Sequence, residues 1–348
     1  MRLKRLTFLL FSILILTGCF SHRSRLGSIA GTIVIREELV GNFDSVEISS
    51  HSSIPKGYLP LQKALVSTKS GQSTQTNSHG YFLINDLPEG RQQITLTVPE
   101  FNITRVFEVD VYPGVINTVF YPVGKGYYLI IGLSQYLYLN DLNSADANAV
   151  EDFFSKTPNT VISVRDQEAT YSNIVEILNN LQKVIRPEDF LLIYFSGHGS
   201  PDKLALYGYS EENQQDALLD NNLKNLLEML DTDNITLVID SCYSGSLFDG
   251  VVRPKALKST PYVILASSKP NQLSYQYSED GGLGYFTKHF LLGLVNRRAD
   301  YNLDGCITSQ EIFTYINIVL STNSVTSPYV QIPVYFDPLS LEPIIYRY

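Results

Sequence analysis

The sequence predicts two folded domains, an N-terminal all-β sandwich followed by a larger α/β domain whose mostly parallel central sheet is flanked by helices. First, the chain has 348 residues, 44% hydrophobic and 18% charged, which is a globular composition with enough chain for two cores. Second, the residues up to Tyr121 form short β-rich runs separated by turn residues. Third, from Gly124 onward apolar runs alternate with segments of helical spacing.

The chain begins with a predicted signal peptide, residues 1–18. Three basic residues precede the apolar run from Leu6 to Leu16, and these eleven residues are too few to span a bilayer. Gly18 and Cys19 follow, and this junction resembles the lipobox of bacterial lipoproteins, in which the cysteine is lipidated after cleavage. The resemblance implies a bacterial cell-envelope protein, lipid-anchored at Cys19 through a tether of residues 19–26, and Phe20 in place of Asp favours the outer membrane. An ordinary secretory signal with an incidental cysteine is the alternative.

Residues 27–122 are predicted to form the β-sandwich. The Gly-rich first strand is followed by Ala64-Leu65-Val66, by a hairpin from Thr76 to Phe82 and by the turn Leu87-Pro88-Glu89-Gly90. This order of motifs resembles the carboxypeptidase regulatory-like (transthyretin-like) β-sandwich. The resemblance implies a structural or adhesive role, and His79 is interpreted as a turn residue rather than a metal ligand.

Residues 124–338 are predicted to form the α/β domain, and residues 339–348 a C-terminal tail. Near-continuous apolar runs predict strands that are buried on both faces, at 127–133, 160–164, 190–195, 235–239 and 262–266. Apolar residues at helical spacing predict helices at 145–154, 171–181, 219–230, 285–295 and 309–320. In such sheets the functional residues lie beyond the carboxyl ends of the strands.

Two of these predicted strand ends carry unusual residues. The run ending at Phe195 leads into Ser196-Gly197-His198-Gly199, and the run ending at Ile239 leads into Asp240-Ser241-Cys242-Tyr243-Ser244-Gly245. If the two strands are neighbours in the sheet, their tips meet. A histidine and a cysteine would then lie close together at one edge of the sheet.

A thiol becomes a good nucleophile when an imidazole removes its proton or favours the thiolate. Cys242 is therefore the candidate nucleophile for attack on a peptide carbonyl, and His198 the candidate acid and base. The backbone N–H groups of Gly199 and Cys242 are the candidate donors to the developing oxyanion. A buried, inert cysteine beside a loop histidine is the structural alternative.

The two motifs resemble those of the caspase, metacaspase and bacterial orthocaspase group (peptidase C14), in which they carry the catalytic dyad. The resemblance covers about two hundred residues and extends to Ala145-Asp146-Ala147 and to Gly284-Tyr285-Phe286-Thr287. It implies the caspase-like fold and a cysteine endopeptidase that acts on peptide or protein substrates.

The resemblance also implies a substrate-binding pair of carboxylates. In metacaspase-like proteins two aspartates line the pocket for the residue before the cleaved bond, and the matching residues are Asp146 and Asp240. Paired carboxylates would select Arg or Lys. Animal caspases select Asp with an arginine ahead of the first helix, and residues 126–155 contain no Lys or Arg. Stabilisation of the helix N-terminus is the alternative role for Asp146.

Residues 300–311 fit the spacing of an EF-hand calcium loop. The candidate Ca²⁺ ligands stand at the positions that supply a side-chain or backbone oxygen in such a loop. They are Asp300, Asn302, Asp304, Cys306 and Glu311. Cys306 stands at position 7, which contributes only its backbone carbonyl. Metacaspase-like enzymes often require calcium. A polar turn that merely joins two helices is the alternative.

The sequence thus predicts a membrane-anchored cysteine endopeptidase, with Ca²⁺ as its expected cofactor. The alternatives are a catalytically silent caspase-like envelope lipoprotein that binds partners, and an envelope adhesin that acts through the sandwich. The net charge is −9, and removal of residues 1–18 takes away three positive and no negative charges to leave −12. With no cluster of Lys and Arg, the chain is not expected to bind nucleic acid.

Overall fold

The structure of the chain is a computed structural model. It describes residues 26–40, 54–98, 103–142, 144–157, 159–212, 214–249, 256–277, 282–303, 305–326 and 330–348. The predicted signal peptide, Cys19 and Asp304 lie outside these residues. Within the described part of the chain, no helix combines the length and the hydrophobicity needed to cross a membrane.

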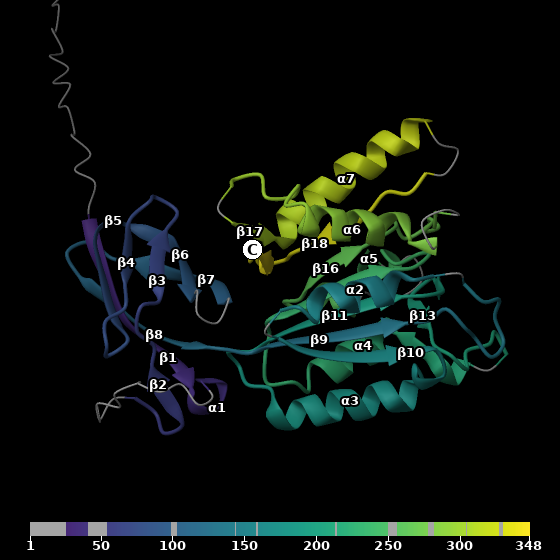
Figure 1. The fold of residues 1–348 in the computed structure, drawn as a ribbon, viewed down its shortest axis with the longest axis horizontal. Coiled ribbons are helices and arrows are strands. Elements are labelled where there is room, and N and C mark those ends of the chain that lie inside the picture. The colour runs from purple at the N-terminus through teal and green to yellow at the C-terminus, as the bar shows by residue number, and fades with distance from the viewer. Residues whose placement is uncertain are drawn as a thin grey trace, which may run out of the picture.

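The N-terminal domain is rich in strands, which form two four-stranded sheets (Figure 1). The first sheet comprises β1 (Leu26–Arg36), β2 (Tyr58–Pro60), β5 (Tyr81–Pro88) and β8 (Ile116–Val123). The second comprises β3 (Leu65–Thr68), β4 (Ser73–Gln75), β6 (Gly90–Val98) and β7 (Ile103–Val111). One short helix, α1 (Glu37–Val40), follows β1. Inward-facing side chains of both sheets share one apolar core.

The hairpin predicted around His79 has a local cause in the sequence. The side-chain Oδ1 of Asn77 accepts hydrogen bonds from the backbone N–H groups of His79 and Tyr81, at 2.9 and 3.0 Å. Gly80 has φ of +69°, and a Cβ there would lie 2.3 Å from the carbonyl oxygen of Ile33. Only glycine fits this turn, and His79 is exposed at its surface.

The second domain is built on a six-stranded sheet in the order β10-β9-β11-β15-β16-β18. The first five strands are parallel and β18 is antiparallel to β16. The strands are β9 (Gly126–Gly132), β10 (Thr160–Arg165), β11 (Phe190–Ser196), β15 (Ile235–Asp240), β16 (Val263–Ala266) and β18 (Val334–Phe336).

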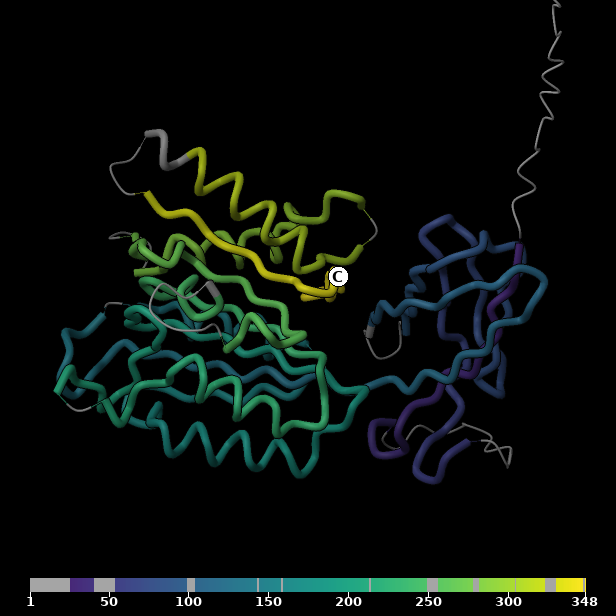
Figure 2. The backbone as a smooth tube through the Cα atoms, turned by 180° about the vertical axis from the view of Figure 1, so that it is seen from behind, coloured from purple at the N-terminus to yellow at the C-terminus, as the bar shows by residue number. Residues whose placement is uncertain are grey.

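Helices cover both faces of this sheet, so its strands are apolar on both sides. On one face lie α2 (Asp146–Phe154), α6 (Tyr285–Val295) and α7 (Ser309–Thr326). On the other lie α3 (Tyr171–Val184), α4 (Asp220–Leu227) and α5 (Ser246–Asp249). Figure 2 shows α3 and α7 on opposite sides of the sheet. The predicted α/β architecture with a mostly parallel sheet is confirmed.

Two small sheets complete the domain. Directly after His198, β12 (Gly199–Ser200), β13 (Lys203–Ala205) and β14 (Ala217–Leu219) form an antiparallel unit. Near the end of the chain, β17 (Cys306–Thr308) pairs with β19 (Ile344–Arg347). Residues 339–348, which we expected as a tail, therefore include a strand, because β17 offers a free edge to which β19 adds.

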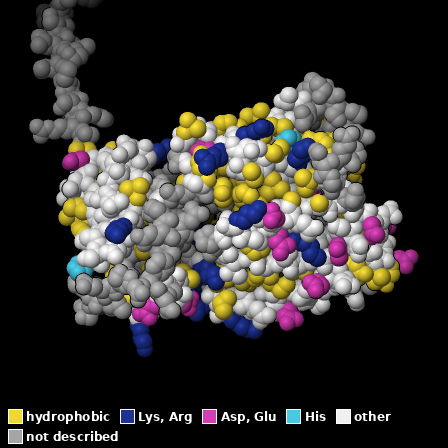
Figure 3. Space-filling model, in the orientation of Figure 1, with side chains coloured by type: hydrophobic (Ala, Val, Ile, Leu, Met, Phe, Trp, Pro, Cys, Tyr) yellow, Lys and Arg dark blue, Asp and Glu magenta, His cyan; other side chains and the backbone are white. Residues whose placement is uncertain are grey.

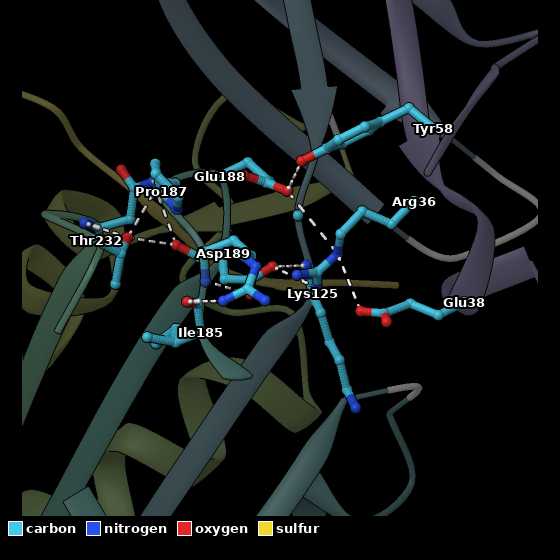
Figure 4. A network of polar contacts seen from close by, with 12 residues as sticks. Arg36, Glu38, Tyr58, Lys125, Ile185, Pro187, Glu188, Asp189 and Thr232 are labelled. Atoms are coloured by element: carbon cyan, nitrogen blue, oxygen red, sulfur yellow. Dashed lines mark hydrogen bonds and ion pairs between the residues drawn. The ribbon is translucent and has the colours of Figure 1, made fainter. Parts of the chain in front are cut away.

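A network of polar side chains joins the two domains (Figure 4). The Nη2 of Arg36 donates to Oδ1 of Asp189 at 3.0 Å, and its Nε lies 3.8 Å from Oε1 of Glu188. The hydroxyl of Tyr58 donates to the same Glu188 oxygen at 2.8 Å. Asp189 is fully buried and also accepts from the backbone N–H of Lys125 at 2.6 Å. These contacts hold the N-terminal domain against the amino-terminal end of β11, whose other end carries His198.

We expect Arg36→Met to lower the free energy of unfolding by about 3 kcal/mol, because it leaves the buried Asp189 without its cation. Arg91→Met is the matched control, since its ion pairs with Glu108 and Asp110 are exposed and worth less than about 1 kcal/mol. Urea denaturation of both variants measures the difference. Equal small losses would show that the network does not stabilise the fold.

Candidate active site

The tips of β11 and β15 lie side by side. Ser196 and Asp240 are register partners, and the backbone N–H of Gly197 donates to the carbonyl oxygen of Asp240 at 3.3 Å. His198 and Cys242 each stand two residues beyond this pair. A Cβ at Gly199 would lie 2.4 Å from the carbonyl oxygen of Cys242. Glycine at 199 is therefore required for the close approach of the two tips.

His198 is oriented by two contacts from the loop after β9. Its backbone N–H donates to the hydroxyl of Tyr136 at 2.6 Å, and its ring Nε2 lies 2.8 Å from the carbonyl oxygen of Asn140. A carbonyl oxygen can only accept, so Nε2 carries the proton. In the neutral ring Nδ1 is then the nitrogen that can accept a proton.

Cys242 stands at a sharp turn, where the next residue, Tyr243, has φ of +58°. The Sγ accepts from the backbone N–H of Ser274 at 3.4 Å and lies 3.8 Å from the carbonyl oxygen of Ser274. Burial raises the pKa of the Cys242 thiol, the Ser274 N–H lowers it, and the charge of Asp240 raises it again. Because the net effect is a raised pKa, the thiol needs a base to become a nucleophile.

The N–H of Gly199 faces away from the neighbouring strand. The backbone N–H of Ala205 donates to the carbonyl oxygen of His198, and the next pair along the ladder is Gly199 with Leu204. Hydrogen-bonded and non-bonded pairs alternate in antiparallel strands, so the 199–204 pair is a non-bonded one. The Gly199 N–H is then free to serve as a donor beside Cys242.

A buried pair of carboxylates lies next to the two strand tips that carry His198 and Cys242. Asp146 begins α2 and Asp240 ends β15, and their exposed fractions are 2% and 5%. Gly284 lies against both, because a Cβ there would be 2.4 Å from Oδ2 of Asp240 and 3.1 Å from Oδ2 of Asp146. The sequence predicted both aspartates, and the structure brings them together beside Cys242.

Each carboxylate is held by its own donors. Asp146 accepts from the hydroxyl of Ser196 at 2.9 Å and from the backbone N–H of Gly284 at 2.7 Å. Asp240 accepts from the hydroxyl of Ser274 at 2.6 Å and from both the hydroxyl and the backbone N–H of Thr287, at 2.7 and 3.1 Å. Neutral donors fix both side chains, and among the described residues no ion pair joins a Lys, Arg or His side chain to either carboxylate.

Burial, and after it the charge of the neighbouring Asp240, raise the pKa of Asp146 to about 7, against the lowering effect of the hydrogen bonds from Gly284 and Ser196. Burial likewise raises the pKa of Asp240. Two acids this close titrate as a pair, and the second ionisation is the costly one. A cation placed between them would favour the doubly ionised form.

We expect this pair to make the fold less stable as pH rises. The native Asp146 keeps its proton where the unfolded chain has released it, so the free energy of unfolding falls between pH values of about 4 and 7, by up to about 1.4 kcal/mol per pH unit. Below the unfolded pKa the contribution is fully present, and above the native pKa it is lost. Urea denaturation across this range should show the fall in the wild type and a weaker one in Asp146→Asn. A constant difference between the two proteins would contradict the raised pKa.

Several residues of the site were not predicted from the sequence. Tyr136 and Asn140 orient His198, while Ser274 contacts both Cys242 and Asp240. The Nε2 of Gln331 in turn donates to the hydroxyl of Ser274 at 3.0 Å. These residues lie on segments without helical or strand periodicity, so no pattern pointed to them. Ser196 carried a signal as part of the histidine motif, and Gly284 and Thr287 carried one as part of the motif at 284–287.

An open hollow adjoins His198 on the side of the β12–β13 turn. Its volume is about 660 Å³. Its lining includes Leu139, Asn140, His198, Pro201, Lys203 and Tyr209. His198 therefore lies at the edge of an open space large enough to admit part of a ligand.

The acidic loop is partly described. Gly305 has φ of +82°, and its backbone N–H donates to Oδ2 of Asp300 at 3.1 Å. Glu311 accepts from the backbone N–H and the hydroxyl of Thr308, at 2.9 and 3.0 Å, and so caps the start of α7. Cys306 is buried in β17. The described residues contain no group of three or more His, Cys, Asp or Glu side chains that could hold a metal, and Asp304 is not among them.

The family model of the caspase domain, Peptidase_C14, matches residues 125–340. Metacaspase-1B of Neurospora crassa is 27% identical over 129 residues, which are 32% of this chain and 30% of that protein. Metacaspase-1A of the same organism is 24% identical over 242 residues, 61% of this chain and 50% of that protein. The chain thus spans half or less of the length of these relatives.

Among solved structures, Caspase-1 from Spodoptera frugiperda aligns with a TM-score of 0.45 and 12% identity, over 62% of this chain and 88% of that one.

Proposed function

The chain belongs to the caspase domain family, and from this premise we propose that it is a cysteine endopeptidase with Cys242 as nucleophile and His198 as acid and base. The observation that carries the proposal is the pairing of Ser196 with Asp240. His198 and Cys242 each follow this pair by two residues, so they lie on adjoining strand tips. The Nε2 contact of His198 supports it, because it leaves Nδ1 as the proton acceptor.

The proposed reaction has two steps. The Sγ of Cys242 attacks the peptide carbonyl carbon while its proton passes to Nδ1 of His198, and the N–H groups of Gly199 and Cys242 stabilise the oxyanion. The C–N bond then breaks, and His198 gives the proton to the leaving amine. Water next attacks the thioester with His198 taking its proton, the C–S bond breaks, and the thiolate regains the proton. The leaving segment departs through the hollow beside His198.

We propose that Asp146 and Asp240 bind the side chain before the cleaved bond, and that this side chain is Arg or Lys. A guanidinium or ammonium group would supply positive charge to two buried carboxylates whose donors in the described part of the chain are neutral. Gly284 contributes to the pocket through its missing side chain, since any Cβ would occupy the space over both carboxylates.

The direct test is hydrolysis of fluorogenic peptides ending in Arg, Lys or Asp, with and without calcium. Cleavage after Arg and Lys but not after Asp supports both the reaction and the pocket. Cleavage after Asp alone would overturn the pocket, and no cleavage by the folded chain would favour a non-catalytic binding protein.

We propose that residues 300–311 bind Ca²⁺, with Asp300, Asn302, Asp304, Glu311 and the carbonyl of Cys306 as ligands. The donors are the oxygens that calcium prefers, and Gly305 has the positive φ that position 6 of such a loop requires. Bound calcium would supply positive charge to these carboxylates and stiffen the start of α7.

For this loop we expect Glu311→Gln to weaken calcium binding by at least about tenfold, since it removes a charged ligand. Glu228→Gln, an exposed carboxylate elsewhere, is the control and should change nothing. Isothermal titration calorimetry measures both. Absence of heat on adding calcium to the wild type would contradict calcium binding by residues 300–311.

We further propose that Cys19 is lipidated and anchors the protein to the bacterial cell envelope, with the outer membrane favoured. The N-terminal strands then serve as a β-sandwich spacer of the carboxypeptidase regulatory-like kind. The buried contacts of Arg36 with Asp189 support this role, because they hold the spacer against the peptidase domain.

A further inference from the structure

Four large apolar side chains are exposed together at one end of the N-terminal domain. They are Leu26, Tyr112, Val115 and Ile116, with exposed fractions of 41%, 61%, 52% and 58%. We call this group the distal tip. Exposed apolar side chains that gather at one place mark an interaction site more often than scattered ones do.

The distal tip is a folded surface. The backbone N–H of Gly114 donates to the carbonyl oxygen of Leu26 at 2.9 Å, and that of Ser28 donates to the carbonyl oxygen of Val115 at 3.1 Å. A Cβ at Gly27 would lie 2.3 Å from the carbonyl oxygen of Tyr112. The start of β1 and the β7–β8 turn are therefore packed directly on one another, and their apolar side chains are displayed without disturbing the core.

The tip lies at the end of the domain that faces away from the dyad. β1 and β8 run parallel, with Ser28 beside Ile116 at one end and Ile35 beside Val123 at the other. Val123 leads into the peptidase domain, and Arg36 contacts Asp189 there. Figure 3 shows hydrophobic side chains at the surface where the described chain begins. The chain thus enters at the tip and reaches the peptidase domain from the opposite end.

The sequence just before the tip is basic. Arg23 and Arg25 precede Leu26, and Cys19 is seven residues away, a reach of at most about 25 Å for an extended chain. Exposed acids lie near the tip as well: Glu89 is in the neighbouring β5–β6 turn, and Asp110 at the end of β7 lies 3.5 Å from the Nε of Arg91. Basic residues beside exposed aliphatic and aromatic side chains are suited to the interface of an anionic membrane.

We propose that the distal tip inserts into the headgroup region of the membrane that holds the anchor, so that the N-terminal domain stands on the surface and orients the peptidase. This inference rests on the proposed lipid anchor. It adds a second membrane contact. A single anchor leaves the orientation of the protein on the membrane undefined, and a second contact fixes it. The eight residues of β8 then place the peptidase domain roughly 25 Å above the surface.

The absence of tryptophan from the chain allows a direct test. Tyr112→Trp puts a single fluorophore in the tip, and Tyr138→Trp, at a tyrosine 62% exposed in the peptidase domain, is the matched control. Residues 20–348 with an N-terminal histidine tag are bound to phosphatidylcholine and phosphatidylglycerol vesicles that carry a nickel-chelating lipid. The tag replaces the anchor, so the test depends neither on lipidation nor on peptidase activity.

The expected result is a blue shift of the Tyr112→Trp emission on vesicles and quenching by brominated lipids, with neither change for Tyr138→Trp. Adding Val115→Asp and Ile116→Asp should abolish both changes. An unshifted Tyr112→Trp spectrum on vesicles would overturn the proposal. So would a blue shift that grows with protein concentration without vesicles, which would assign the tip to contact between copies of the chain.

Discussion

Cys242→Ala is expected to abolish peptide hydrolysis while the fold is retained. The variant removes the thiol on the strand tip that adjoins the tip of His198, and loss of a catalytic nucleophile lowers kcat by about 10⁴-fold or more. Circular dichroism and urea denaturation establish that the variant is folded, and the rate on a peptide ending in Arg measures the loss. Cys306→Ala is the control, because this buried cysteine lies in β17 and should leave the rate unchanged.

His198→Ala should reduce the rate to a similar degree, because the raised pKa of Cys242 leaves the thiol protonated without a base. The double variant should be no slower than either single one, since the two residues act as a unit. Additive losses in the double variant would contradict the dyad.

Asp146→Asn and Asp240→Asn are each expected to lower kcat/KM for Arg and Lys peptides by about a hundredfold, which corresponds to about 2.7 kcal/mol. Each change removes one carboxylate of the pair and leaves the other to bind the cation alone. Both side chains accept hydrogen bonds from neutral donors, so an amide also lowers the stability of the pocket. The ratio of rates for Arg and for uncharged peptides is therefore the quantity to compare.

Asp152→Asn is the matched control for the charge of α2, because Asp152 lies on the same helix with its side chain exposed beside Lys156. It should leave that ratio within about twofold of the wild type, as expected for an exposed ion pair. A hundredfold loss in the control as well would mean that general electrostatic attraction, and not the pocket, selects basic residues.

The sequence was informative wherever chemistry followed a regular pattern. Continuous apolar runs predicted strands buried on both faces, and the structure confirms them because Tyr128 and Ile130 of β9 face one core while Leu129 and Ile131 face the other. His198 and Cys242 stood out because each ends such a strand. Parallel strands place their carboxyl ends at one edge, so the adjacency of the two tips followed from the order of β11 and β15.

The remainder of the site depends on contacts that are distant in sequence and leave no periodic signal. The Nε2 of His198 is oriented by a backbone carbonyl at Asn140, and any residue there can provide a carbonyl. Ser274 and Gln331 reach the site from irregular segments. The Arg36–Asp189 pair joins residues 153 positions apart, and no single-sequence pattern marks such a partnership.

The most direct test of a Cys–His peptidase with an acidic pocket is covalent capture. The chain is incubated with a peptidyl-arginine acyloxymethyl ketone and with its aspartate and alanine analogues, and mass spectrometry then locates the adduct. The predicted result is a single adduct on Cys242, formed fastest with the arginine reagent, slowed by Asp146→Asn and absent from His198→Ala. Labelling of Cys306, or labelling of Cys242 at the same rate by all three reagents, would contradict the proposed site.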